Sequence, residues 1–112
     1  MQKPVMNTEL ILEEPQQVAD GGGGFQIVWS PVGTLWAEVK STSARERVMG
    51  GREVAELSHQ IIVRGAPADS PRRPSVQRRF RSGNRIFQIF GIANYDARGR
   101  YLTCWTKEAL AA

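Results

Sequence analysis

The sequence of 112 residues contains only one cysteine, Cys104, and only one histidine, His59. A single cysteine cannot form a disulfide within the chain, and together the two residues supply too few ligands for a zinc site. A catalytic thiol would need the histidine beside it as a base, and no other acid–base constellation is present. We therefore expect both to be structural residues, with no metal, no cofactor and no enzymatic activity.

Long apolar segments are also missing. The first fourteen residues hold no apolar signal core, and no run approaches the roughly 18 apolar residues of a membrane span. Apolar residues make up 41% of the chain and charged residues 23%, the balance of an ordinary soluble protein. The length predicts one domain over residues 1–112. We expect no contact with a membrane, and a protein that stays in the cytosol or leaves it only inside an assembly.

Acidic residues are scarce between residues 64 and 85. This segment holds seven arginines and one acid, Asp69, for a formal charge of +6. The other residues include eight basic and ten acidic side chains, for a charge of −2. A planar guanidinium suits bidentate contact with phosphates or carboxylates. The candidates for contact with a partner are Arg64, Arg72, Arg73, Arg78, Arg79 and Arg81.

Two apolar runs near the C-terminus predict an antiparallel hairpin. Residues 86–93 and 101–105 are rich in β-branched and aromatic side chains, and the turn-forming residues 96–99 lie between them. A hairpin alone is marginal in water, so other strands must cover its apolar residues. We expect the core to include Ile86, Ile89, Phe90, Leu102 and Cys104, together with Leu35, Ala37 and Val39.

Further strands precede this hairpin. Alternating side chains predict them at residues 9–14, 25–29, 34–40, 52–64 and 77–81. We expect the first to lie at a sheet edge and to end at Pro15, and the segment Pro31–Gly33 to interrupt and bend the chain between the next two. Ser43 could cap a short helical turn over residues 44–49, which the double glycine at positions 50 and 51 would end.

The remaining stretches are polar. We expect a loose arm at residues 1–8, a polar loop at residues 16–24 whose four terminal glycines suit a hairpin connection, and a short tail at residues 106–112. A phosphate-binding loop would need a Gly-Lys-Ser/Thr ending that opens a helix, and the glycines lack it. The segment Gly65–Val76 holds three prolines and no apolar period, so it predicts an extended loop.

The count of six or seven strands with at most one short helix predicts an all-β fold. A small antiparallel β-barrel or sandwich fits this count. Trp36 lies on the more polar face of its strand. It could anchor an interface with a partner, or it could lie flat over neighbouring strands.

The sequence resembles the head–tail adaptor proteins of tailed phages, also called head-closure or stopper proteins. The resemblance covers roughly residues 9–108, and it depends on the order and spacing of several pieces. These are the glycine-rich turn into an aromatic strand at Asp20–Trp29, the strand Leu35–Val39, the element Ser43–Glu46 before the strand Glu56–Ile61, and the pattern Gly83–Ile89 with its paired strand Tyr101–Cys104.

This resemblance implies a small β-barrel that forms a ring, usually of six copies, in the neck of a phage, prophage-derived or gene transfer agent particle. The ring would join the portal-side adaptor ring to a tail-side ring and help to close the DNA channel, after a stay in the host cytoplasm. In such proteins a long loop can reach into the channel. We therefore expect Gly65–Val76 and its flank to Arg81 to face packaged DNA or a neighbouring ring.

Two other interpretations stay open. The arginines could be plainly solvated, or the chain could be a small basic β-barrel that binds nucleic acid as a monomer, using aromatic residues such as Phe80 and Phe87 near the basic segment. The alternation of these aromatics, which is typical of core residues, speaks against the nucleic-acid interpretation.

Overall fold

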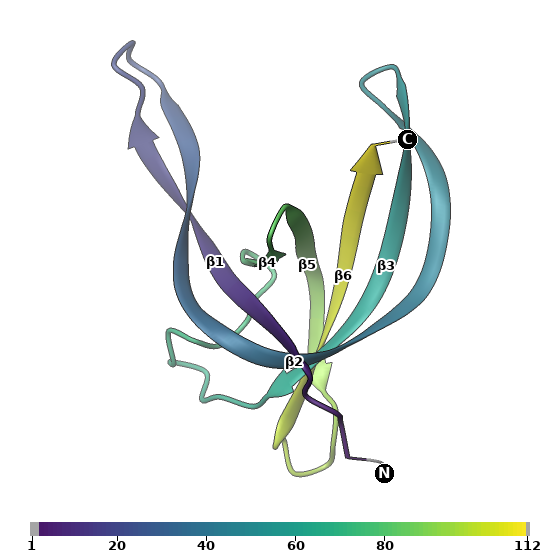
Figure 1. Ribbon diagram of the computed structural model, residues 1–112. Coiled ribbons are helices and arrows are strands. Elements are labelled where there is room, and N and C mark those ends of the chain that lie inside the picture. The colour runs from purple at the N-terminus through teal and green to yellow at the C-terminus, as the bar shows by residue number, and fades with distance from the viewer. Residues whose placement is uncertain (1–2, 112) are drawn as a thin grey trace.

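Six antiparallel β-strands close into a barrel (Figure 1). The structure is a computed structural model that describes residues 3–111. Around the barrel the strands follow the order β1-β2-β3-β6-β5-β4. The all-β antiparallel fold predicted from the sequence is confirmed. The strands are β1 (Thr8–Ala19), β2 (Phe25–Met49), β3 (Arg52–Arg64), β4 (Arg79–Ser82), β5 (Arg85–Asn94) and β6 (Tyr101–Ala111).

β2 runs unbroken for 25 residues. Its first part pairs with β1 and its later part pairs with β3. Its register against β1 shifts at Val32, between the pairs Glu13 with Pro31 and Leu12 with Gly33. The Pro-Gly segment therefore bends the strand, as expected, but the predicted interruption is wrong. Val32 is thus an extra residue in the ladder, a β-bulge. A bulge increases the bend and twist of its strand, so it helps a small sheet to curl into a barrel.

The helical turn predicted over residues 44–49 is also wrong. These residues belong to β2 and pair with β3, from Ala44 opposite Leu57 to Met49 opposite Arg52. Gly50 and Gly51 both have positive φ angles, of 60° and 77°. Two consecutive residues in this region form a tight hairpin turn whose twist matches that of the flanking strands. The double glycine thus joins two strands and does not end a helix.

The hairpin of residues 14–30, which we call the first arm, extends beyond the barrel (Figure 1, upper left). β1 pairs with β4 only through Ile11–Glu13, and β2 meets β3 only from Ala37 onward. β1 does not end at Pro15, because β2 supplies a partner for every residue up to Ala19, so residues 16–19 form a strand and not the expected loop. The expected edge position is wrong for Ile11–Glu13, which pair with β4 as well as with β2. Beyond Glu13 the outer edge of β1 is free, where a proline is tolerated.

A second projection rises at the opposite side of the same end (Figure 1, upper right). It consists of the distal parts of β2 and β3 with the end of β6, which pairs with β3 as far as Ala111 opposite Val54. The tail predicted at residues 106–112 is therefore a strand up to residue 111, and Ala112 lies outside the described residues. No helix within residues 3–111 is long and apolar enough to cross a membrane.

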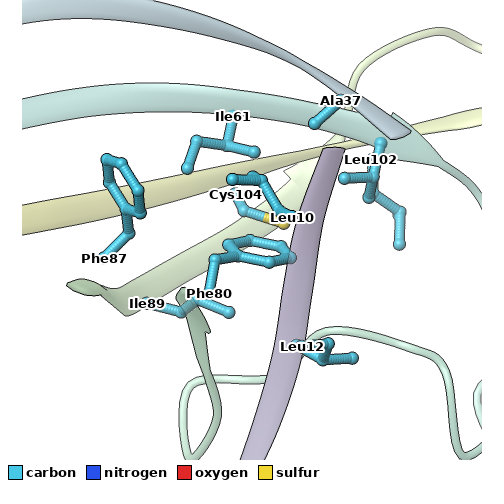
Figure 2. Close-up of a cluster of buried hydrophobic side chains, with 10 residues drawn as sticks. Leu10, Leu12, Ala37, Ile61, Phe80, Phe87, Ile89, Leu102 and Cys104 are labelled. Carbon is cyan, nitrogen blue, oxygen red and sulfur yellow. The ribbon is translucent and has the colours of Figure 1, made fainter. Parts of the chain in front are cut away.

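The core fills the space where the six strands meet (Figure 2). Its residues are at most 2% exposed, and Val32, Leu35, Val39 and Ile92 pack against it while partly buried. Ala37, Ile89, Leu102 and Cys104 were predicted correctly, and Leu35 and Val39 in part. The cluster consists of Leu10, Leu12, Ala37, Ile61, Val63, Phe80, Phe87, Ile89, Leu102 and Cys104.

Phe90 is the main error in the predicted core, because its side chain is 54% exposed. The register between β5 and β6 shifts between Ile89 and Gly91, so Phe90 is the extra residue of a bulge. Phe87 and Ile89 point inward, so the alternation of a strand already places Phe90 on the outer face, and the bulge changes the phase only beyond it, where Ile92 packs against the core. Phe87 occupies the core, and Ile86, also predicted there, is only half-buried.

The chain before β1 lies close to β2. The backbone N–H of Val5 donates a hydrogen bond to the carboxylate of Glu38 at 2.8 Å, and Pro4 is buried. Of the arm expected at residues 1–8, Met1 and Gln2 lie outside the described residues.

Candidate functional site

The loop Gly65–Val76 connects β3 to β4 and is held by its own hydrogen bonds. The N–H of Ser70 donates to the carbonyl of Pro67 at 3.0 Å, and the N–H of Arg73 donates to Ser70 at 3.2 Å. The Arg73 guanidinium closes the base of the loop with a 2.6 Å bond to the carbonyl of Ala66. Part of the charge predicted to face a partner therefore stabilises the shape of the loop.

Arg78 ties this loop to the first arm. Its Nη1 donates to the carbonyls of Pro71 and Arg73, and its Nη2 lies 3.3 Å from the carboxylate of Glu14. Its side chain is only 18% exposed. Arg78 is thus engaged within the chain.

Arg79 and Arg81 bind one buried carboxylate across the junction of β1 and β4. Each Nε donates to a different oxygen of Glu13 at 2.8 Å, and Glu13 is only 4% exposed. Burial raises the pKa of Glu13, but the hydrogen bonds from Arg81 and Arg79 outweigh this and hold the pKa below its usual range. The Arg79 guanidinium also lies 4.1 Å from the ring centre of Trp29, a cation–π contact.

A second buried carboxylate, Glu108, lies between Arg85 and His59. Arg85 donates two bonds to it, at 2.7 and 2.9 Å, and Nε2 of His59 lies 2.9 Å away. The bonds from Arg85 lower the pKa of Glu108 against the opposing effect of burial, and His59 adds to the lowering. His59 is 2% exposed and is also bonded through Nδ1 to Ser41, so it is the structural histidine that the sequence predicted.

Cys104 offers no reactive thiol. It lies in the core, and burial raises the pKa of its thiol to about 12. Reactive cysteines require a thiolate and access to solvent. Within residues 3–111, no group of three or more histidine, cysteine or acidic side chains could hold a metal ion.

Arg64 and Arg72 flank a surface groove of ≈ 660 Å³. Met6, Leu35 and Trp36 supply apolar lining, and the Trp36 side chain is 56% exposed. Arg72 is fixed there by a bond from Nη2 to the carbonyl of Thr34. Trp36 therefore combines an exposed ring with two neighbouring cations, which is the setting of an interface anchor.

A smaller hollow of ≈ 360 Å³ adjoins the other side of Arg64. Lys3 and Arg100 line it together with Tyr95 and Tyr101, and Arg64 lies over the Tyr101 ring at 5.8 Å. Sequence analysis missed Lys3 and Arg100, since neither belongs to the arginine-rich segment. No local signal could have found them, because only the fold brings these distant residues to one end of the barrel.

The six predicted arginines therefore separate into two groups. Arg73, Arg78, Arg79 and Arg81 are bonded to carbonyls or carboxylates within the chain and do not line the groove beside Trp36, whereas Arg72 lines that groove although it too is bonded to a carbonyl. Arg64 and Arg72 meet Trp36 at the groove, which we call the Trp36 groove.

Comparison with known proteins identifies the fold's relatives. The sequence model of one family, described as phage head completion protein, matches residues 1–109. The chain belongs to this family. A solved structure described as the virion of a native gene transfer agent particle contains a similar chain, 42% identical, with a TM-score of 0.89. The alignment covers 98% of this chain and 100% of that chain. No curated protein matches the sequence.

This membership confirms the resemblance found in the sequence. As a phage head completion protein, the chain is a structural component of a phage or phage-like particle, and it acts in the virion.

Proposed function

We propose that the chain is a non-enzymatic neck protein, forming a ring of about six copies that joins the portal-side adaptor ring to a tail-side ring and helps to close the DNA channel. The observation that carries this proposal is the likeness of the whole chain, at 42% identity, to a chain of a gene transfer agent virion. The family's description, completion of the head, supports a place where the head ends.

The first arm supports assembly with neighbours. It consists of two strands only, and Phe25 and Ile27 are 69% and 52% exposed. A two-stranded hairpin is marginal in water, and free strand edges pair readily with other chains. An arm of this kind gains stability when another subunit covers it.

The distribution of the arginines refines their proposed role. Arg79 and Arg81 share the charge of Glu13, and Arg78 lies beside Glu14, so the basic segment is partly neutralised. Contact outside the chain, with channel DNA or with an acidic surface of a neighbouring subunit, is therefore assigned to Arg64 and Arg72. The other four arginines of the predicted set hold the loop and the barrel in place.

Complementation of incomplete particles tests the proposal. Cells that produce particles without this chain should accumulate DNA-filled heads and separate tails. Purified chain added to a mixture of these heads and tails should restore joined particles, counted by electron microscopy, and DNA transfer. The same mixture without added chain is the control. Joined, DNA-filled particles made without the chain would refute the neck role.

A further inference from the structure

The tip of the first arm combines an apolar surface with a single negative charge. Phe25 and Ile27 alternate along β2, so they lie on one face, and both are more exposed than buried. Asp20 is the only charged residue between Pro15 and Ser30. Its Oδ1 accepts hydrogen bonds from the N–H groups of Gly22 and Gly24, at 2.8 and 3.1 Å.

These two bonds fix the exposed carboxylate at the turn, and they hold the pKa of Asp20 below its usual range. The tip is therefore anionic at neutral pH. Within the described chain, neither Phe25 nor Ile27 belongs to the core cluster or packs against it.

The Trp36 groove has the complementary character. Met6, Leu35 and Trp36 supply its apolar lining, the cations Arg64 and Arg72 line it as well, and no acidic side chain does so. A guanidinium has five donors, so Arg72 keeps free N–H groups beside its bond to Thr34. A volume of ≈ 660 Å³ falls within the range of pockets that enclose drug-sized groups, and aromatic side chains are smaller.

The tip and the groove of one molecule cannot meet. The tip of the arm lies at the top of the view in Figure 1. Along β2, nine residues of extended strand lead from Phe25 to Thr34 at the groove, about 30 Å at roughly 3.3 Å per residue. The molecule extends for 50 Å along its longest axis. A tip that fits this groove must therefore come from another copy.

We propose that the first arm of one copy inserts Phe25 and Ile27 into the Trp36 groove of the next copy, with Asp20 placed between Arg64 and Arg72. This inference rests on the proposed ring. The contact joins two different patches, so it is head-to-tail, and such contacts generate closed rings when the rotation between copies closes. A tip that bound another tip would instead give isolated pairs.

Cysteine cross-linking in assembled particles tests the contact. The variant pair is Gly22→Cys at the tip and Thr34→Cys at the groove wall. Gly22 lacks a positive φ and has room for a side chain, and Thr34 contributes only its backbone carbonyl to the bond from Arg72. The native Cys104 is fully buried and stays silent toward a thiol reagent. A short bifunctional thiol cross-linker is added to purified joined particles.

The expected result is a covalent ladder that rises from the dimer to the complete ring on a denaturing gel. Each single variant, and the control pair Gly22→Cys with Ala97→Cys on the exposed β5–β6 turn, should stay monomeric. Joined particles without a ladder would overturn the arm–groove contact and leave the neck role intact. Dimers from Gly22→Cys alone would overturn it in favour of contact between tips.

Charge reversal provides a second measurement that needs no cross-linker. Asp20→Arg should lower the yield of joined particles about tenfold, because a third cation then faces Arg64 and Arg72. Adding Arg64→Asp in the same chain should restore part of that yield, since the exposed Arg64 makes only a ring contact with Tyr101. A double variant no better than Asp20→Arg alone would refute the pairing. Circular dichroism of each purified variant shows whether it is folded.

Discussion

Phe87 and Phe90, three residues apart on β5, provide a sharp test of the core. The Phe87 side chain is 1% exposed, while Phe90 is 54% exposed. Truncating a buried phenylalanine to alanine costs about 3–5 kcal/mol, through lost apolar burial and the cavity left behind. Phe87→Ala should reach this range, because the ring also contacts His59 edge-on at 5.2 Å and lies beneath Arg85 at 4.9 Å.

Phe90→Ala serves as the matched control. Its ring is about half in solvent and contacts Lys107, whose Nζ lies 5.1 Å from the ring centre. Surface substitutions usually change stability by about 0.5 kcal/mol, and the half-buried part of the ring could raise the cost to about 1 kcal/mol. The two variants share a strand and a substitution, so the difference between them isolates burial.

Thermal and urea unfolding, followed by circular dichroism, measure both variants. A change of 1 kcal/mol shifts the melting temperature of a domain this size by about 4–8 °C. Phe87→Ala should therefore lower it by at least about 12 °C, and Phe90→Ala by no more than about 8 °C. If Phe90→Ala proved the more destabilising of the two, the register that turns Phe87 inward and Phe90 outward would be wrong.

Three further predictions follow from the ion pairs, the loop and the arms. Glu108→Gln should cost about 2 kcal/mol at pH 7, because a charge-assisted bond is lost while Arg85 stays half-exposed. The pKa of Glu108 is lowered from 4.5, so the stability it contributes is present above that pH and is lost as the pH falls through the folded-state pKa. The free energy of unfolding, measured in urea, should differ less between pH 7 and pH 3 in the variant than in the unmodified chain. An equal difference would contradict this role of Glu108. The double variant Arg72→Ala, Arg73→Ala should give joined particles that leak DNA if the loop Gly65–Val76 faces the channel. If the loop pairs with a neighbouring ring, DNA-filled heads without tails should accumulate. Normal particles would contradict both proposed contacts. Purified chain should sediment mainly as a monomer, because we propose that the ring assembles only against a preformed neck, and a stable ring of isolated chain would contradict that proposal.

The sequence predicted the elements whose signals are local. Turn residues bounded the hairpin of β5 and β6, and alternation defined β3 over Arg52–Arg64. The continuous β2 could not be predicted, because Ala, Arg and Glu at positions 44–47 also suit a helix. The ladder with β3 pairs every residue of this segment, from Ala44 opposite Leu57 to Met49 opposite Arg52, and tertiary contacts of this kind override propensity.

The candidate site, too, could be predicted only where its signal is local in the sequence. Composition revealed the arginine-rich segment, but the acids that bind it lie far away in the chain. Glu13 lies 66 residues from Arg79, and Glu108 lies 23 residues from Arg85. The outward position of Phe90 was also hidden, because a run as apolar as residues 86–93 does not show which of its two alternating faces is buried.

The junction of β1 with β4 has a consequence for how the chain folds. Only three residue pairs close the barrel there, joining Ile11–Glu13 to Arg79–Arg81, segments almost 70 residues apart. Forming such contacts requires closing a long loop, and barrels dominated by distant pairings fold slowly, within milliseconds to seconds. β3 and β6 form a far longer ladder, so the junction should form last during folding and open first under stress. The ion pairs of Glu13 with Arg79 and Arg81 then hold the closed barrel together at this junction. Until they form, a newly synthesised chain exposes strand edges that can pair wrongly with other copies.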